Sequence, residues 1–100
     1  MLNCVFMIGR VASMPARAPE SSSKDALMTL NVTQPFTDES GIPDTTPVDV
    51  SLWRALSELV TGVCHPGSLV AVRGRLVRQN DRLVVRAETL ELLDHQLQTI

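Results

Sequence analysis

Five arginines gather between Gly67 and Leu93, in "GSLVAVRGRLVRQNDRLVVRAETLELL", although the chain of 100 residues has a formal net charge of −2 at pH 7. A guanidinium group binds phosphate through a planar fork of N–H donors, and it also stacks on nucleobases. Arginines that share one face of a strand would therefore suit a nucleic-acid backbone. The alternative is that they only solubilise a sheet face, which is the commoner role of a charged strip.

The segment reads as two strands joined by a tight turn at Asn80-Asp81, because Asn and Asp readily adopt positive φ. Pairing backwards from this turn places Arg75 opposite Arg86 and Arg73 opposite Glu88. Like charges directly opposite each other mildly destabilise a sheet, and a bound anion would relieve the repulsion.

Alternation along the two strands predicts which side chains enter the core and which face outward. The predicted inward set is Val70, Val72, Leu76, Leu83, Val85 and Ala87. The predicted outward set is Arg73, Arg75, Val77, Val84 and Arg86.

The elements before this hairpin follow from the apolar pattern. "LNCVFMIGRV" predicts a strand that is apolar on both faces, and residues 12–25 predict a loop rich in proline and serine. "ALMTLNVTQPF" alternates as a half-buried second strand, residues 37–47 predict another loop, and "VDVSLW" predicts a third strand. Helical spacing then begins at Leu56 and stops at "HPG", which predicts about three turns of helix.

The order of three strands, a short helix and two strands is that of an all-β, five-stranded oligonucleotide-binding barrel, with the helix between strands three and four. The length fits a single domain over residues 1–100, with disorder allowed for in the last few residues. Hydrophobic residues make up 44% and charged residues 20%, which is a globular composition.

Several classes of protein are disfavoured by what the sequence lacks. No apolar run approaches the length of a membrane span, so we expect a soluble, intracellular protein. Cys4, Cys64, His65 and His95 show no metal-ligand spacing, and no nucleophile has a partnered base. We therefore expect no catalytic residue, no metal and no cofactor.

Stacking platforms for single-stranded nucleic acid would have to come from three aromatic residues. Phe6 in the first strand is assigned to the core or to an interface. Phe36 ends the second strand, where exposure is expected. Trp53 ends the third strand next to Arg54, and a lone tryptophan there serves either as a plug of the barrel or as a platform for a base.

Five blocks in this order resemble the oligonucleotide-binding domain of bacterial single-stranded DNA-binding proteins: "NCVFMIGRVASMPAR", "TLNVTQPFTDESG", "VDVSLWRALSELV", "PGSLVAVRGRL" and "AETLELLD". The likeness runs from about Leu2 to Asp94, and the ending also resembles that of primosomal replication protein N, a dimeric relative. The resemblance implies binding of single-stranded DNA without sequence preference, assembly of identical subunits through the first strand and sheet faces, and no catalysis.

By position, the resemblance assigns Phe36 and Trp53 to base stacking. It places Arg10, Arg54, Arg73 and Arg75 where the family commonly has backbone-contacting or other polar residues. Charge and placement, rather than the motif, add Arg86 and Lys24.

Three departures from the family pattern predict weaker binding, a smaller site per subunit and no recruitment through a tail. An aromatic early in the third strand corresponds here to about Pro47, and the loop between strands four and five is reduced to "RQNDR". The chain stops at "HQLQTI", so the acidic tail that recruits repair and replication enzymes is not expected.

The leading hypothesis is a cytoplasmic, nucleoid-associated protein that binds single-stranded DNA in replication, recombination or repair, as a homo-oligomer with a tetramer favoured over a dimer. The alternative is a diverged barrel that docks replication or repair proteins and binds DNA weakly or not at all. The sequence leaves open whether the arginine hairpin faces DNA or a subunit interface. It also leaves open the affinity, the preference between DNA and RNA, and the pathway.

Overall fold

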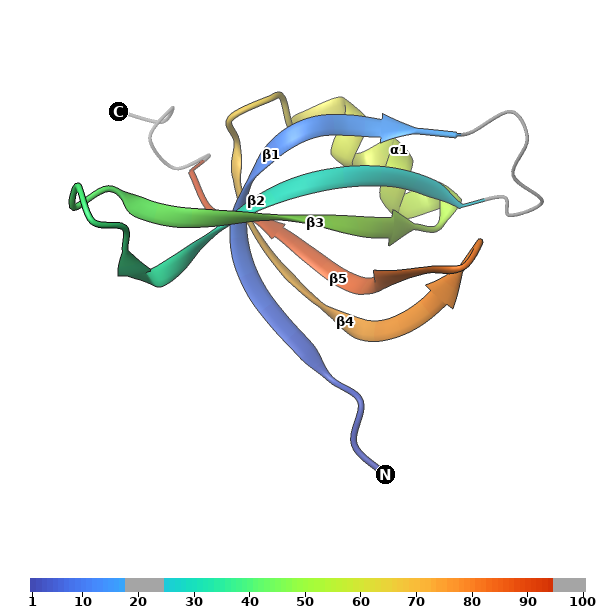
Figure 1. Ribbon diagram of the computed structural model, residues 1–100. Coiled ribbons are helices and arrows are strands. Elements are labelled where there is room, and N and C mark those ends of the chain that lie inside the picture. The colour runs from blue at the N-terminus through green and yellow to red at the C-terminus, as the bar shows by residue number, and fades with distance from the viewer. Residues whose placement is uncertain (18–24, 95–100) are drawn as a thin grey trace.

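A computed structural model describes residues 1–17 and 25–94. The elements in chain order are β1 (Val5–Ala16), β2 (Ala26–Thr37), β3 (Pro43–Leu52), α1 (Arg54–Val63), β4 (Leu69–Gln79) and β5 (Arg82–Leu92). The strands close into a barrel in the order β1-β2-β3-β5-β4, and α1 lies behind β1 and β2 in the view of Figure 1. The predicted five-stranded barrel, with its helix between the third and fourth strands, is confirmed.

The core of the barrel consists of the inward side chains of all five strands and of one side of α1. Met28 and Leu30 on β2 are fully buried, as the alternation of that strand predicts. The buried cluster contains Val11, Met28, Leu30, Val50, Leu52, Leu56, Val60, Cys64, Val70, Val72, Val85 and Ala87. No helix among the described residues is long and apolar enough to cross a membrane.

Two strands are longer than the sequence predicts. β1 continues to Ala16, because irregular pairing places Ser13 opposite Thr29 and Ala16 opposite Leu27, and Pro15 is tolerated at such a register shift. β3 begins at Pro43 instead of Val48, because residues 43–47 continue to pair with β2.

The early part of β3 and the end of β2 form a projecting hairpin, residues 33–46, which we call the arm (Figure 1). The turn of the arm is ordered by Asp38, whose Oδ1 accepts hydrogen bonds from the Ser40 amide at 2.9 Å, the Ser40 hydroxyl at 2.7 Å and the Ile42 amide at 3.0 Å. These bonds lower the pKa of Asp38, and the bond from the Ser40 hydroxyl has the largest effect. The predicted loop is therefore confined to the few residues between Thr37 and Pro43.

Candidate nucleic-acid interface

The β4–β5 hairpin has the predicted turn and register. Asn80 and Asp81 have φ values of 52° and 62°, which are the two positive angles of a type I′ turn. Arg75 lies directly opposite Arg86. Two guanidinium groups on neighbouring strands therefore share one outward face of the barrel.

A register shift between Arg73 and Gly74 changes the pairing beyond this point. Gly74 lies opposite Ala87, whereas Arg73 lies opposite Thr89 instead of Glu88. The predicted pairing of Arg73 with Glu88 is therefore wrong. The shift also explains the glycine, since a Cβ atom at residue 74 would lie 2.1 Å from the carbonyl oxygen of Arg86.

The prediction of which side chains face inward is wrong near the turn. Leu76 and Leu83 are exposed, Leu83 to 70%, while Val84, which was predicted to face outward, is buried. β3 and β5 pair only at Val50 and Ser51 of β3, so the barrel wall ends before it reaches Leu83. Val84 lies on the opposite side of β5 from Leu83, between Arg82 and Arg86. Both arginines form ion pairs with residues of other segments, and these side chains help to cover Val84.

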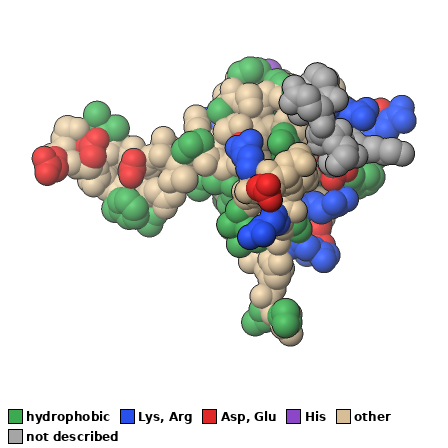
Figure 2. Space-filling view, turned by 45° about the vertical axis from the view of Figure 1, so that its right-hand side comes forward, with side chains coloured by type: hydrophobic (Ala, Val, Ile, Leu, Met, Phe, Trp, Pro, Cys, Tyr) green, Lys and Arg blue, Asp and Glu red, His purple; other side chains and the backbone are tan. Residues whose placement is uncertain are grey.

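Each of three outward arginines contacts a carboxylate of the same chain. Arg75 Nη2 donates to Glu88 Oε2 at 2.7 Å, and Arg86 Nη1 lies 3.3 Å from Asp25 Oδ2. Arg82 donates to Asp49. Figure 2 accordingly shows basic and acidic side chains interspersed on the body of the molecule.

The hydrogen bond from Arg75 to Glu88 changes the titration of both groups. It lowers the pKa of Glu88 below its ordinary value, and the charges of Arg75 and Arg73 add to the effect. The same bond raises the pKa of Arg75. Glu88 is therefore held in its charged form next to two guanidinium groups.

Polar side chains at the start of β2, on β3 and at the end of β4 are joined by hydrogen bonds next to these ion pairs. The fully buried Ser51 hydroxyl lies 3.2 Å from Asp25 Oδ2 and 3.0 Å from Gln79 Oε1. On the next rung of β2 and β3, the Thr29 hydroxyl donates to Asp49 Oδ1 at 3.1 Å. The network fixes Asp49 on the outward side of β3 and Asp25 at the start of β2.

Trp53 lies beside this face. It follows β3 in an extended conformation and precedes the first residue of α1, and its side chain is 45% exposed. It is therefore a surface residue and not a plug of the barrel. Side chains two positions apart on extended backbone share a side, so Trp53 shares a side with Ser51, about 7 Å away along the chain. Ser51 in turn pairs with Arg86.

The remaining predicted residues are more scattered. Arg54 forms an ion pair with Glu58 one turn along α1, with Nε and Oε1 3.1 Å apart. Phe36 is 58% exposed on the arm, nine residues along β2 from Leu27, which pairs with Ser51. That spacing corresponds to about 30 Å of strand. Lys24 lies outside the described residues.

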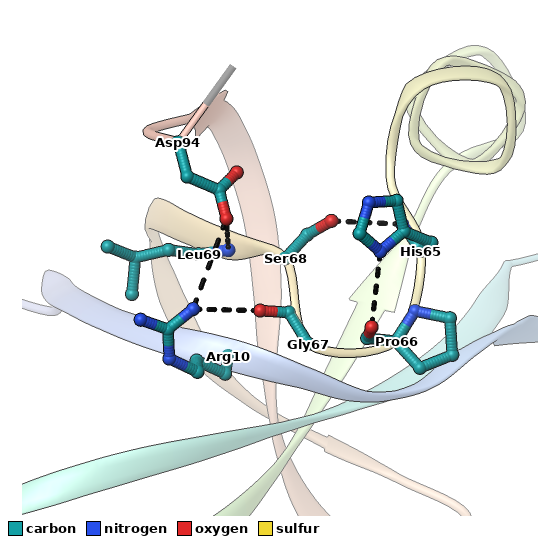
Figure 3. Close-up of polar contacts among 7 residues, drawn as sticks. All are labelled: Arg10, His65, Pro66, Gly67, Ser68, Leu69 and Asp94. Atoms are coloured by element: carbon teal, nitrogen blue, oxygen red, sulfur yellow. Dashed lines mark hydrogen bonds and ion pairs between the residues drawn. The ribbon is translucent and has the colours of Figure 1, made fainter. Parts of the chain in front are cut away.

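Arg10 is placed at the other end of β4 from the turn (Figure 3). Its Nη1 donates to the Gly67 carbonyl at 2.9 Å and lies 3.9 Å from Asp94 Oδ2, which accepts from the Leu69 amide at 3.0 Å. It pairs with Leu69, six residues before Arg75, or about 20 Å along the strand. The structure therefore does not bring Arg10 together with the arginines near the turn.

Sequence reasoning missed some basic residues. Arg82 belongs to the outward face, and alternation along β5 could have placed it there. Arg17 and Arg78 are exposed, and neither forms an ion pair with another residue in the part of the chain described. Within the same ranges, no three His, Cys, Asp or Glu side chains are grouped to hold a metal ion.

The arm differs from the barrel in charge. It bears Asp38, Glu39 and Asp44 and has no lysine or arginine, and both Phe36 and Ile42 are exposed on it. In Figure 2 a segment projects from the body with acidic and hydrophobic side chains among uncharged polar ones, and no basic side chain is seen on it.

Comparisons with known proteins agree with this architecture. The family model described as "Single-strand binding protein family" matches residues 2–98. Single-stranded DNA-binding protein B of Bacillus subtilis is 35% identical over 76% of this chain and 68% of its own length. Protein A of the same organism is 35% identical over 80% of this chain, but this chain spans only 47% of that protein.

Two solved structures share the fold. The small single-stranded DNA-binding protein from Streptomyces coelicolor has a TM-score of 0.71 and 21% identity, with 94% of this chain and 95% of that chain covered. The N-terminal domain of PriB protein from Thermoanaerobacter tencongensis, described as dimeric, has a TM-score of 0.57 and 21% identity, with 93% and 98% covered. On the extent of the family match and the identity to the Bacillus subtilis proteins, the chain belongs to the single-strand binding protein family.

Proposed function

We propose that this protein binds single-stranded DNA without sequence preference and without catalysing a reaction, in replication, recombination or repair. The observation that carries the proposal is the exposed Trp53, two residues after Ser51, on the side of the barrel where Ser51 pairs with Arg86 and Arg86 lies opposite Arg75. A basic surface beside an aromatic ring is what a single strand needs, because phosphates bind the cations and bases stack on the ring.

We propose that the strand crosses the outward face of β2, β3 and β5. Trp53 lies at one end of this face, and Phe36 would offer a second ring on the arm beyond the other end, about 30 Å along β2 from Leu27, the partner of Ser51. Arg75 and Arg86 would contact the backbone on the hairpin side, and Arg73, which lies opposite Phe6 of β1, would contact it at the border between this face and β1. Arg54 follows Trp53 directly and would extend the basic surface onto α1. Arg10 would contact DNA only if the bound strand continued to the end of β4 that lies away from the turn.

The test is a titration with oligo-dT followed by the fluorescence of Trp53, the sole tryptophan of the chain. We expect quenching that saturates at low salt and is reversed by added salt, because phosphate contacts release counterions. A folded protein whose fluorescence and mass do not change with oligo-dT would refute the proposal.

We also propose that the protein is a homo-oligomer, with a tetramer favoured over a dimer. Phe6 and Ile8 lie exposed on the outward side of β1, opposite Arg73 and Ala71 of β4. Two large apolar side chains exposed side by side on a sheet face are typical of a subunit contact. Sedimentation equilibrium measures the mass, and a monomer at micromolar concentration would contradict this proposal.

The arm supports the second candidate function, docking of a replication or repair protein. Its three carboxylates repel phosphate, whereas its exposed Phe36 and Ile42 suit a basic-rimmed apolar pocket of another protein. Docking through the arm would be weakened by Ile42→Ser. Binding of oligo-dT would not be weakened, so this variant separates the two functions.

A further inference from the structure

The outward arginines are arranged for an anion and are already in contact with anions of the same chain. We propose that the carboxylates of Glu88, Asp25 and Asp49 compete with DNA phosphates for the arginines of the β4–β5 hairpin. Each phosphate bound there would then replace an internal ion pair, and the acids would set the affinity. The inference rests on the proposed binding of single-stranded DNA.

The contacts support direct competition. A carboxylate and a phosphate bind guanidinium through the same N–H donors. Glu88 uses Nη2 of Arg75 at 2.7 Å, a length typical of a charge-assisted hydrogen bond. Glu88 also relieves the repulsion between Arg75 and Arg86, which lie directly opposite each other. An anion relieves the same repulsion, so a phosphate would take over the role of Glu88.

The three carboxylates differ in how readily they could be replaced. Arg75 and Glu88 have side chains that are 54% and 41% exposed, so solvent and a ligand reach both partners. Asp25 is only 13% exposed and also contacts the buried Ser51 hydroxyl. Asp49 accepts from Thr29 in addition to Arg82. Glu88 should therefore exchange first, while Asp25 and Asp49 also hold β2 and β3 to β5.

The experiment compares the full chain with its Glu88→Gln variant in binding labelled oligo-dT at fixed low salt. We expect about two- to fivefold tighter binding, the range that corresponds to an exposed ion pair. The matched control is Asp44→Asn, which makes the same change of net charge on the arm. Asp44 forms no ion pair with another residue in the described ranges, so its removal frees no arginine, and we expect a smaller gain.

A double-mutant cycle identifies the arginine responsible. In an Arg75→Gln background, the Glu88→Gln substitution should give no more than the gain of the Asp44→Asn control. An equal gain with and without Arg75, or a gain no larger than that of the control, would overturn the inference. Urea denaturation confirms that each variant is folded.

Acidification provides an independent readout. In the free protein Arg75, with Arg73, holds the pKa of Glu88 below its ordinary value of 4.5. Loss of Arg75 to a phosphate would raise this pKa, so binding would take up a proton. Affinity for oligo-dT should then increase as the pH falls below about 4.5. The increase should be smaller in Glu88→Gln, and identical pH profiles would contradict the exchange.

The inference and the proposed function fail in different ways. If the folded wild type binds no oligo-dT, the proposed function is refuted and the inference with it. If the wild type binds but Glu88→Gln binds no more tightly than Asp44→Asn, only the inference is refuted.

Discussion

Replacing Gly74 by alanine should separate β4 from β5 at the point where the register shift places Arg75 opposite Arg86. A Cβ atom there would lie 2.1 Å from the Arg86 carbonyl oxygen, 2.9 Å from the Arg86 carbonyl carbon and 3.1 Å from the Ala87 Cα. All three are backbone atoms, so no side-chain rotation can relieve the contact. The Arg86 carbonyl would have to move by about 1 Å, which is a case of overpacking in a close-packed interior.

The expected cost is about 1–3 kcal/mol of unfolding free energy. For a domain of this size, that corresponds to a fall of about 1 M in the urea midpoint. Because subunit association adds to apparent stability, all variants are compared at one protein concentration. The displaced Arg86 should also weaken binding of oligo-dT.

The matched control is Gly62→Ala in α1, where a new Cβ has no neighbour within 4 Å. Alanine inside a helix is favoured over glycine, so we expect a gain of about 0.5–1 kcal/mol. If Gly74→Ala unfolds at the same urea concentration as the wild type, the assignment of the close contact to residue 74 is wrong. Gly74 would then not be the residue that fixes the register of Arg75 and Arg86.

Three further predictions concern the surface. Trp53→Ala should weaken binding of labelled oligo-dT by about 5- to 100-fold through lost stacking. The control Leu59→Ala truncates an exposed side chain of α1 and should leave binding unchanged, so equal losses would contradict a role for the indole ring. Arg73→Gln should reduce the slope of log affinity against log salt by about 0.7, the value for one phosphate of a single strand, and an unchanged slope would remove Arg73 from the interface. Phe6→Ser should lower the mass of the assembly in sedimentation without unfolding it, whereas Ile42→Ser on the arm should leave the mass unchanged; the same mass for both would refute the proposed β1 contact.

Local signals in the sequence are enough to predict much of the fold. The Asn80-Asp81 turn fixes the register of the hairpin from the turn to Gly74, so the opposition of Arg75 and Arg86 is predictable from the sequence. The change from alternation to helical spacing after Trp53 likewise predicts α1. Both signals come from residues close together in the chain.

The features that were missed depend on contacts between distant segments. The spacing from the turn does not reveal the register shift at Arg73. Because of this shift Glu88 does not lie opposite Arg73, and it accepts a hydrogen bond from Arg75. Arg86 and Asp25 are 61 positions apart in the sequence, so closure of the barrel alone brings them together. The exposure of Leu83 has the same origin, because it depends on where the pairing of β3 with β5 ends.

These long-range contacts change what the arginines imply. The opposition of Arg75 and Arg86 predicts an external anion, yet Glu88 and Asp25 already balance these charges. The aromatic Trp53 and the family membership therefore support DNA binding more strongly than the arginine count does. Affinity should depend on the difference between phosphate and carboxylate as partners of the same guanidinium groups.

The most direct test of the central claim is a map of amide chemical shifts in the labelled protein during titration with oligo-dT. The proposed interface predicts that the largest changes occur at the Trp53 indole N–H and at backbone amides of residues 73–86. Changes confined to the tip of the arm, residues 38–42, or no changes at saturating oligo-dT, would contradict it.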